Sequence, residues 1–321
     1  MINKALLLMF FCFLLAACSG SDGDVRDIPA PDSNNPEIRL KADVWQMMEG
    51  TRATTYDNAA LQSNGFKCAV YEINTITPYI ASVNVNWGGS GWAFSDGSHE
   101  WHPDGTHLDF FAYSPQTIPS YIDIDSDSNP DVTYAVNGTP SPAPHFSCTM
   151  PINLTPADAT QEFVWALTAD QSKEANGSGV TMTFRRPFAC IRFKLSEASG
   201  TNVRVNSISI PGIYTSGTCT LTGTGGTATS TWSSLSGNSN PLTITGSPAT
   251  SDDAVYLVIP YNYGSQTLTV NATWTELSAV ENVDVSASVN FNWEAGHSYT
   301  YTLKLKDYIL IVDTDKFTEQ W

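Results

Sequence analysis

The feature that most constrains the fold of this chain is a residue-by-residue alternation of apolar and polar side chains. The clearest cases are residues 268–274 and 283–293, where every second side chain is apolar. A period of two places one set of side chains on each face of a β-strand. Turn residues separate many such stretches from about residue 38 onward, and no stretch shows a convincing period of 3.6 residues. The sequence therefore predicts an all-β chain of sandwich type with little helix.

Residues 197–201, Glu-Ala-Ser-Gly-Thr, divide the expected strands into two sets. We therefore expect two tandem β-sandwich domains, at residues 38–196 and 197–321. Arg186-Pro187 interrupts a long apolar stretch in the first set, and proline cannot donate to a sheet ladder, so an edge or a bulge is expected there. In the second set the apolar positions change from odd numbers at Val205 to even numbers at Ile208, which predicts a bulge.

Residues 1–17 have the pattern of a signal peptide. Lys4 precedes an apolar run at residues 5–15 that is too short to span a bilayer. The following Leu15-Ala16-Ala17-Cys18 resembles the lipobox of bacterial lipoproteins, in which the cysteine is acylated, for example with palmitate. Residues 18–37 are polar and rich in proline, a composition that cannot bury a core. We expect a lipid on Cys18 and a flexible tether to the outer membrane.

The charge and the cysteines exclude some functions. The net charge of −17 repels phosphate backbones, so a nucleic acid partner is not expected. Cys68, Cys148, Cys190 and Cys219 are widely spaced and form no Cys-x-x-Cys pair, which argues against a zinc site. In an exported protein they either form disulfides or serve as small buried apolar residues, and both alternatives remain open.

No catalytic constellation stands out, so the sequence predicts neither an enzyme nor a bound cofactor. No nucleophile elbow and no phosphate-binding glycine loop occur. His99, His102 and His107 gather near Trp101, but no carboxylate or cysteine lies at a familiar zinc spacing from them. A surface hairpin is the favoured interpretation of that segment.

The acidic run from Asp123 to Asp131 places oxygen ligands at alternate positions, as a calcium loop does. It has Ser128 where an EF-hand has glycine, and Tyr134 where an EF-hand has a carboxylate. A solvated acidic loop is favoured over a calcium site, and no metal is predicted.

Five segments stand out, in order, as more than strand patterns: Trp101 to Pro115, Val180 to Phe193, Ile208 to Tyr214, Tyr256 to Pro260 and Trp293 to Tyr301. Together they resemble consensus segments of the fimbrillin family, whose members are main and accessory subunits of type V pili. Pro187-Phe188 stands where that family usually has a histidine region.

The resemblance implies two β-sandwich domains of transthyretin-like topology and assembly by strand exchange. Subunits of that family travel to the surface as lipoproteins, and an arginine-specific protease removes the lipidated segment with an early strand. The emptied groove accepts a strand from the next subunit, which is a form of β-augmentation. The processing site maps to Arg52 and Ala53. The donor strand maps to Tyr308, Ile309, Leu310, Ile311 and Val312, which otherwise form an ordinary closing strand of the second domain.

The function implied is a structural or accessory subunit, shaft or tip, of a surface pilus that serves cell adhesion. Its partners would be other pilus subunits in a homo- or hetero-polymer, the outer membrane through Cys18 before processing, and a host or bacterial surface ligand. Whether it is a shaft, tip or anchor subunit stays open. The alternative is a non-polymerising, glycan-binding surface lipoprotein, since 9 Trp and 13 Tyr could supply stacking surfaces for sugars.

Overall fold

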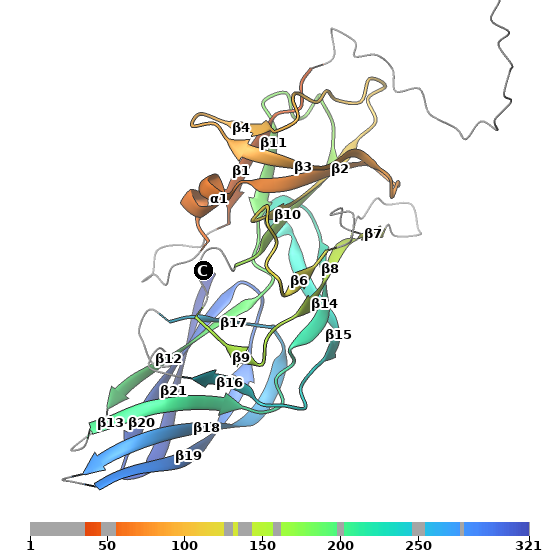
Figure 1. Cartoon of the computed structure of the whole chain (residues 1–321). Helices are drawn as coiled ribbons and strands as arrows, with labels where there is room; N and C mark the ends of the chain where they lie inside the picture. The colour runs from red at the N-terminus through yellow and green to blue at the C-terminus, as the bar shows by residue number, and fades with distance from the viewer. Residues whose placement is uncertain are drawn as a thin grey trace, which may run out of the picture. The chain divides into compact units, whose positions relative to one another are not determined.

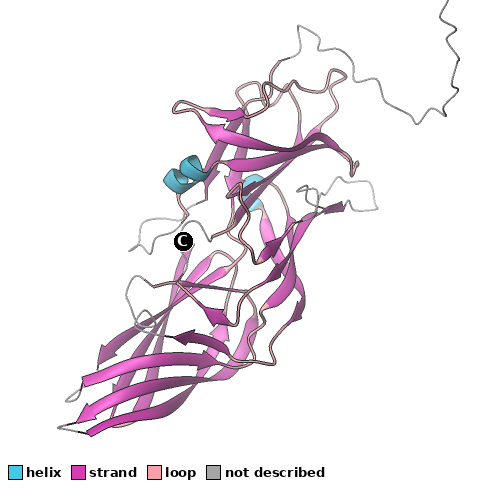
Figure 2. Ribbon diagram, viewed as in Figure 1, coloured by secondary structure: helices cyan, strands magenta, loops and turns pink. Residues whose placement is uncertain are grey.

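Strands make up nearly all of the regular structure (Figures 1 and 2). This computed structural model describes residues 36–45, 56–124, 131–133, 143–156, 162–197, 202–245, 254–276 and 279–320. Within those ranges the only helices are α1 (Asn58–Asn64) and a single turn of 3-10 helix, Gly225–Thr227. The all-β class predicted from the alternation is confirmed.

The first sheet has seven strands in the spatial order β10-β5-β2-β3-β4-β1-β11. In that order their bounds are Val164–Gln171, Leu108–Ser114, Phe66–Glu72, Pro78–Trp87, Trp92–Phe94, Leu40–Val44 and Val180–Phe184. We call it the curled sheet, because an isolated bridge between Trp165 and Arg185 joins its two end strands. The amide of Trp165 donates to the Arg185 carbonyl at 3.0 Å, and the amide of Arg185 donates to the Trp165 carbonyl at 2.7 Å.

One face of the curled sheet encloses its own apolar core, which includes Leu40, Phe66, Val85, Phe110 and Met182. The other face of β5 and β10 carries a second core with Phe111 and Trp165. Both faces of β5 are therefore covered, and all seven of its residues are buried. A strand buried on both faces reads as a continuous apolar run, which explains why the Leu108 to Tyr113 stretch lacks alternation.

A second sheet, in the order β15-β14-β8-β6 with β7 beside β8, shares that second core. Its strands are Thr229–Ser236 (β15), Ser216–Thr222 (β14), Ala143–Thr149 (β8), Ile122–Asp123 (β6) and Asp131–Thr133 (β7). The core is rich in aromatic rings, with Phe146 packed edge-on against both Trp165 and Trp232 at centroid distances of 4.8 and 5.8 Å.

Two further sheets share a third core that contains Phe193, Trp274, Phe291 and Tyr301. The four-stranded sheet has the order β17-β12-β20-β21, with bounds Tyr256–Val258, Ala189–Glu197, His297–Lys306 and Ile309–Gln320. The five-stranded sheet has the order β19-β18-β13-β16-β9, with bounds Ala279–Asn292, Asn262–Glu276, Asn202–Ile210, Leu242–Thr245 and Asn153–Leu154.

The structure bears on two local predictions. The register of β13 against β18 shifts between Val205 and Ser207, so the bulge predicted from the phase change is confirmed. At Arg186-Pro187 the structure has a crossing between sheets in place of the expected edge or bulge, because β11 ends at Phe184 in the curled sheet and β12 begins at Ala189 in the four-stranded sheet.

The boundary expected at residues 196/197 falls inside β12, which pairs in parallel with β20 and antiparallel with β17. Strand pairs also join the two sides of that boundary, since β8 pairs with β14 and β9 with β16. The chain therefore passes between sheets more than once. The division into two tandem sandwich domains of transthyretin-like topology stays a prediction.

Candidate functional site

Strand β1 is the first strand of the described chain, and its two neighbours hold it unequally. Five residue pairs, from Leu40–Val180 to Val44–Phe184, join it in parallel to β11. On its other side a single pair, Leu40–Trp92, joins it to β4. Near its start the amide of Ile38 also donates to the carbonyl of His99 at 2.7 Å. β1 is therefore held in the sheet mainly by its ladder with β11, and hardly at all by β4.

The side chains of β1 divide sharply between core and solvent. Leu40 and Val44 are buried in the core of the curled sheet, as is Ile38 just before the strand. Burying a side chain of this size contributes about 1.5–3 kcal/mol. Arg39 and Lys41 alternate with these residues and are exposed. The strand thus fills the core with one face and presents charge on the other.

The C-terminal end of β1 is fixed by three contacts. The amide of Val44 donates to Asn58 Oδ1 at 2.7 Å, and the amide of Trp45 donates to the carbonyl of Phe184 at 2.9 Å. The guanidinium of Arg185 lies over the Trp45 ring, 3.9 Å from its centroid. Among the residues that the structure describes, its Nε atom is buried without a hydrogen-bond partner, and the ring offers this cation a favourable contact.

The chain is described again from Tyr56, and here it is firmly anchored. The amide of Tyr56 donates to Glu162 Oε2 at 2.8 Å, and its carbonyl accepts from Arg186 Nη2 at 2.5 Å. Arg186 Nε also lies 2.6 Å from Glu162 Oε1, and both side chains are only 4% exposed. Burial raises the pKa of the Tyr56 hydroxyl, which bonds to Ser114 Oγ. Asp57 then caps α1 by accepting from the amide of Ala60 at 2.8 Å.

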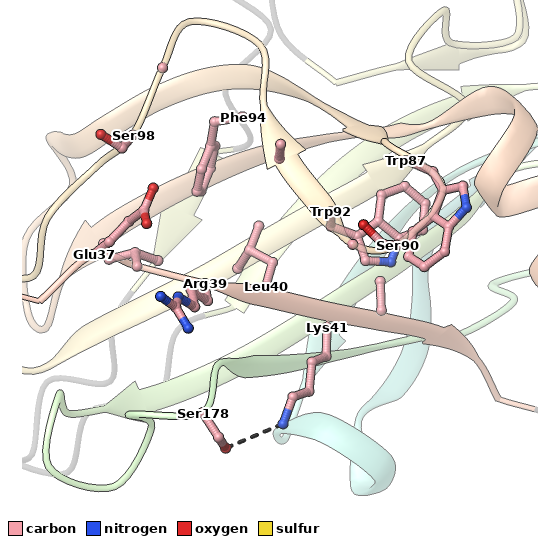
Figure 3. Close-up of a pocket in the computed structure, with 15 residues that line it drawn as sticks. Glu37, Arg39, Leu40, Lys41, Trp87, Ser90, Trp92, Phe94, Ser98 and Ser178 are labelled. Carbon is pink, nitrogen blue, oxygen red and sulfur yellow. Dashed lines mark hydrogen bonds between the residues drawn. The ribbon is translucent and has the colours of Figure 1, made fainter.

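A groove of about 760 Å³ lies over β1 (Figure 3). Part of it lies where residues 93–99 stand opposite only residues 38–39, between the Leu40–Trp92 pair and a bridge from Glu37 to Glu100, and its lining continues past that pair to Lys41 and Trp87. The longer segment must arch away from β1, which leaves the hollow beneath it. We call this hollow the arch groove.

The walls of the arch groove differ in chemistry. One wall is aromatic, with Trp87 edge-on to Trp92 at 5.3 Å and Phe94 further along β4. Along β1 the lining includes Glu37, Arg39 and Lys41, which alternate with the core-facing Leu40 and so lie on the opposite face of the sheet from the aromatic side chains. Figure 3 shows Lys41 reaching Ser178, with its Nζ donating to Ser178 Oγ at 3.2 Å.

The segment predicted as the donor strand forms the start of β21 and the turn before it. Asp307 and Tyr308 have φ of 50° and 61°, so they make the tight turn from β20, and β21 begins at Ile309. The Tyr308 ring packs on Trp274 at 5.1 Å. Ile309 and Ile311 are 60% and 52% exposed, whereas Leu310 between them is buried.

Along its whole length β21 pairs with β20, and it lies at one end of the four-stranded sheet. Lys304 Nζ and Asp313 Oδ2 add an ion pair at 2.6 Å across the two strands. In the isolated chain this segment is thus a closing strand at a sheet edge, and its role as donor strand stays a prediction.

The four cysteines left open by the sequence are all free and buried. Burial raises the pKa of the Cys68 and Cys190 thiols to about 12, and it raises those of Cys148 and Cys219 as well. A thiol protonated at neutral pH is a poor nucleophile. These side chains act as small apolar core residues.

The histidines near Trp101 do not share a centre, because each contacts a different carboxylate. His99 Nε2 lies 2.9 Å from Asp96, His102 Nδ1 lies 2.5 Å from Asp104, and His107 Nδ1 lies 2.6 Å from Asp170. Among the described residues no group of three or more His, Cys, Asp or Glu side chains is placed to hold a metal ion.

Several predicted residues lie outside the described ranges. These are Cys18, Arg52, Ala53 and the middle of the Asp123 to Asp131 run, of which β6 and β7 contain only the ends. The described helices include none long and apolar enough to cross a membrane.

Sequence reasoning missed two features. Glu162, just before β10, and Arg186, just after β11, both approach Tyr56, and no local pattern connects residues so far apart in sequence. The arch groove was missed although the alternation of Arg39 and Lys41 with apolar residues was visible, because its aromatic wall comes from β3 and β4.

This architecture resembles that of several known proteins. A model of the family described as fimbrillin-like matches residues 51–321. A fimbrial protein from Bacteroides vulgatus ATCC 8482 has a similar structure, with 16% identity, a TM-score of 0.53, and coverage of 88% of this chain and 100% of that one. A proposed cell adhesion protein from Bacteroides ovatus ATCC 8483 aligns with 15% identity and a TM-score of 0.52, over 88% of this chain and 96% of that one. At these identities the structures share a fold. No match to the sequence was found among curated proteins.

Proposed function

The chain belongs to the fimbrillin-like family of pilus subunits, and on that basis we propose that it polymerises at the cell surface by strand exchange after its N-terminal strand is removed. Members of this family are structural proteins, so the chain is not an enzyme. Cell adhesion through the assembled pilus is the purpose that we assign to it. The proposal has two parts, a groove left by β1 and a strand that fills it.

The observation that carries the proposal is the contrast on the two sides of residues 46–55. Before them, β1 has a complete ladder on one side only. After them, Tyr56 is locked by the buried Glu162–Arg186 pair. A cut between Arg52 and Ala53 would therefore release β1 while leaving the following chain in place.

Loss of β1 would open a gap between β4 and β11. The gap would expose the core pockets of Ile38, Leu40 and Val44, together with the unpaired edge of β11. An incoming strand would restore the main-chain ladder with its backbone and fill the pockets with alternate side chains. Apolar residues at every second position are the requirement on that strand.

The start of β21 meets this requirement. Ile309 and Ile311 are exposed in the isolated chain and lie on one face, where they have no core to fill. Exposed β-branched residues on an edge strand invite pairing with another chain. We propose that Tyr308 to Val312 leaves β20 and enters the groove of the next subunit.

The lipid on Cys18 belongs to the same scheme. We propose that it attaches the unprocessed chain to the outer membrane, and that cleavage after Arg52 separates the pilus subunit from it. A subunit that escaped cleavage would stay at the membrane as the base of the fibre.

The processing step is tested with the Arg52→Ala variant. In cells that carry the arginine-specific protease, wild-type chain from sheared fibres should begin at Ala53, and Arg52→Ala should stay membrane-bound and unpolymerised. Arg26→Ala, which removes another arginine ahead of β1, is the matched control and should assemble normally. Fibres of Arg52→Ala chains that begin at Cys18 would contradict the proposal.

The donor strand is tested with an Ile309→Asp, Ile311→Asp double variant. Both side chains are exposed, so the subunit should fold, but aspartates cannot enter an apolar groove and polymers should be lost. Ile76→Asp is the matched control, because Ile76 is 75% exposed in the turn between β2 and β3. Normal ladders of polymers from the double variant on gels would show that another segment is the donor.

A further inference from the structure

A second cavity lies on the outer face of the curled sheet, where β1 and β11 end. Its volume is about 270 Å³, just below the roughly 300–1,000 Å³ of small-molecule sites, so it suits a compact ligand. Its lining comes from the ends of β1 and β11, the start of β15, and the turn between β19 and β20. We call it the Arg185 cavity.

The pairing register places Trp45 and Arg185 on the same face of the curled sheet. Val44 pairs with Phe184, and both of these side chains lie in the core that the sheet encloses. Because successive side chains of a strand alternate between faces, the next residue of each chain points to the outer face. There the Arg185 guanidinium lies over the Trp45 ring, 3.9 Å from its centroid.

Strand β15 and the turn before β20 approach this same face. Trp165 forms a bridge with Arg185, and its indole Nε1 donates to Ser230 Oγ at 3.1 Å. The amide of Gly296 donates to the carbonyl of Phe188 at 2.8 Å, which fixes the turn beside the chain that leaves β11. The three parts of the lining therefore surround one cavity.

Arg185 is the basic residue of this cavity that lacks an ion pair among the described residues. Arg186 Nε lies 2.6 Å from Glu162 Oε1, and His297 Nε2 lies 3.7 Å from Glu294 Oε2. No acidic side chain belongs to the lining. Burial lowers the pKa of the Arg185 guanidinium, because the charged form loses contact with water. A single cation thus stands here without a counter-ion.

We propose that the Arg185 cavity binds a compact organic acid through its carboxylate. A carboxylate accepts two parallel hydrogen bonds from one guanidinium and balances its single charge, whereas a phosphate dianion would bring a second charge. Asp43 on β1 also favours the charged form of Arg185, but it forms no ion pair with it among the described residues. Trp45, Ala228 and Ala295 supply apolar surface for the body of the acid.

The site is tested with benzoate and benzamide, which have nearly the same shape and differ in charge. The full, uncleaved chain is titrated in detergent solution, because Trp45 precedes Arg52 and would be lost in the proposed processing. Ligand-observed NMR gives the affinities. We expect benzoate to bind about tenfold more tightly than benzamide, the effect of one charged hydrogen-bonded pair. Inorganic phosphate at the same concentration as benzoate should not displace it.

Matched variants locate the binding. Arg185→Gln should remove the preference for benzoate, whereas Arg204→Gln, at an exposed arginine on β13, should keep it. Trp45→Ala should weaken the binding of both ligands. Thermal melts of each variant show whether it is folded.

The wild-type chain provides a test that does not depend on a variant of Arg185. The indole N–H signal of Trp45, assigned by its loss in Trp45→Phe, should shift in the NMR spectrum when benzoate is added. The proposal is overturned if this signal stays in place, if neither ligand binds at millimolar concentration, or if both bind equally to the wild-type chain. Displacement of benzoate by equal phosphate, or a loss of preference in Arg204→Gln, would overturn it as well.

Discussion

The first and last strands of the described chain, β1 and β21, are held in opposite ways. β1 lies inside a sheet, between β4 and β11, and its apolar face is part of a core. β21 lies at the end of a sheet, with one neighbour and with isoleucines facing solvent. Removing β1 would open a gap in a closed structure, whereas removing β21 would shorten an edge. The contrast is the one that the proposed strand exchange requires, with a groove opened at β1 and a donor taken from β21.

The largest expected effect is at the buried Glu162–Arg186 pair, which fixes the chain at Tyr56. Arg186→Met leaves the Glu162 carboxylate buried without its cation, which should lower the free energy of unfolding by about 3–5 kcal/mol. Urea unfolding of the full chain measures it. Lys304→Met is the control, because it breaks the exposed pair with Asp313 on β20 and β21 and should cost only about 0.2–1 kcal/mol. If both variants lost the same free energy of unfolding, the chain after residue 55 would be held no more firmly than the edge strand β21.

The two strands should also differ in how they respond to truncation of one buried leucine. Leu40 and Leu310 are 7% and 6% exposed, so their burial is matched. Leu40→Ala leaves a cavity between two neighbouring strands and should lose an amount near the upper end of about 2–5 kcal/mol. Leu310→Ala lies on an edge strand that can shift to fill the space, and its loss should be near the lower end. A larger loss for Leu310→Ala in urea unfolding would reverse the assignment of interior and edge.

A smaller effect is expected at Trp45, whose ring contacts Arg185 just after the end of β1. Trp45→Ala removes the ring beneath the Arg185 guanidinium and should cost about 0.5–1 kcal/mol. Because this contact holds only the end of the strand, amide hydrogen exchange should rise at residues 41–44 and stay unchanged in β21. A uniform rise over the whole curled sheet would show that Trp45 supports more than β1.

The smallest effect is expected on the exposed face of β21. Ile311→Thr keeps a β-branched side chain in a strand and touches no core, so the free energy of unfolding should change by less than about 0.5 kcal/mol. Its effect on polymerisation should nevertheless be clear, since a hydroxyl would enter the apolar groove. A large loss of stability in the monomer would mean that Ile311 packs in the isolated chain and is no free donor residue.

Features that depend on neighbouring residues could be predicted from the sequence. The bulge after Val205 follows from a change in phase, and the burial of β5 on both faces follows from the four apolar residues Phe110 to Tyr113 in a row. Features that depend on distant strands could not. The parallel pairing of β12 with β20 and the approach of Glu162 to Tyr56 join residues about a hundred positions apart, and no local period records such pairs. For the same reason the arch groove, built from β1 and β4, was invisible in the sequence.

The full-length pairing of β21 with β20 has a consequence for the direction of assembly. A donor strand that leaves one ladder to join another replaces each main-chain hydrogen bond by an equivalent one. These bonds therefore contribute almost no net free energy to assembly. Directionality must come from elsewhere, and hydrolysis of a peptide bond is irreversible under cellular conditions. Under the proposed mechanism, uncleaved chains stay monomeric. Cleavage by the protease, rather than the strength of the contacts in the fibre, then determines when and where the fibre grows.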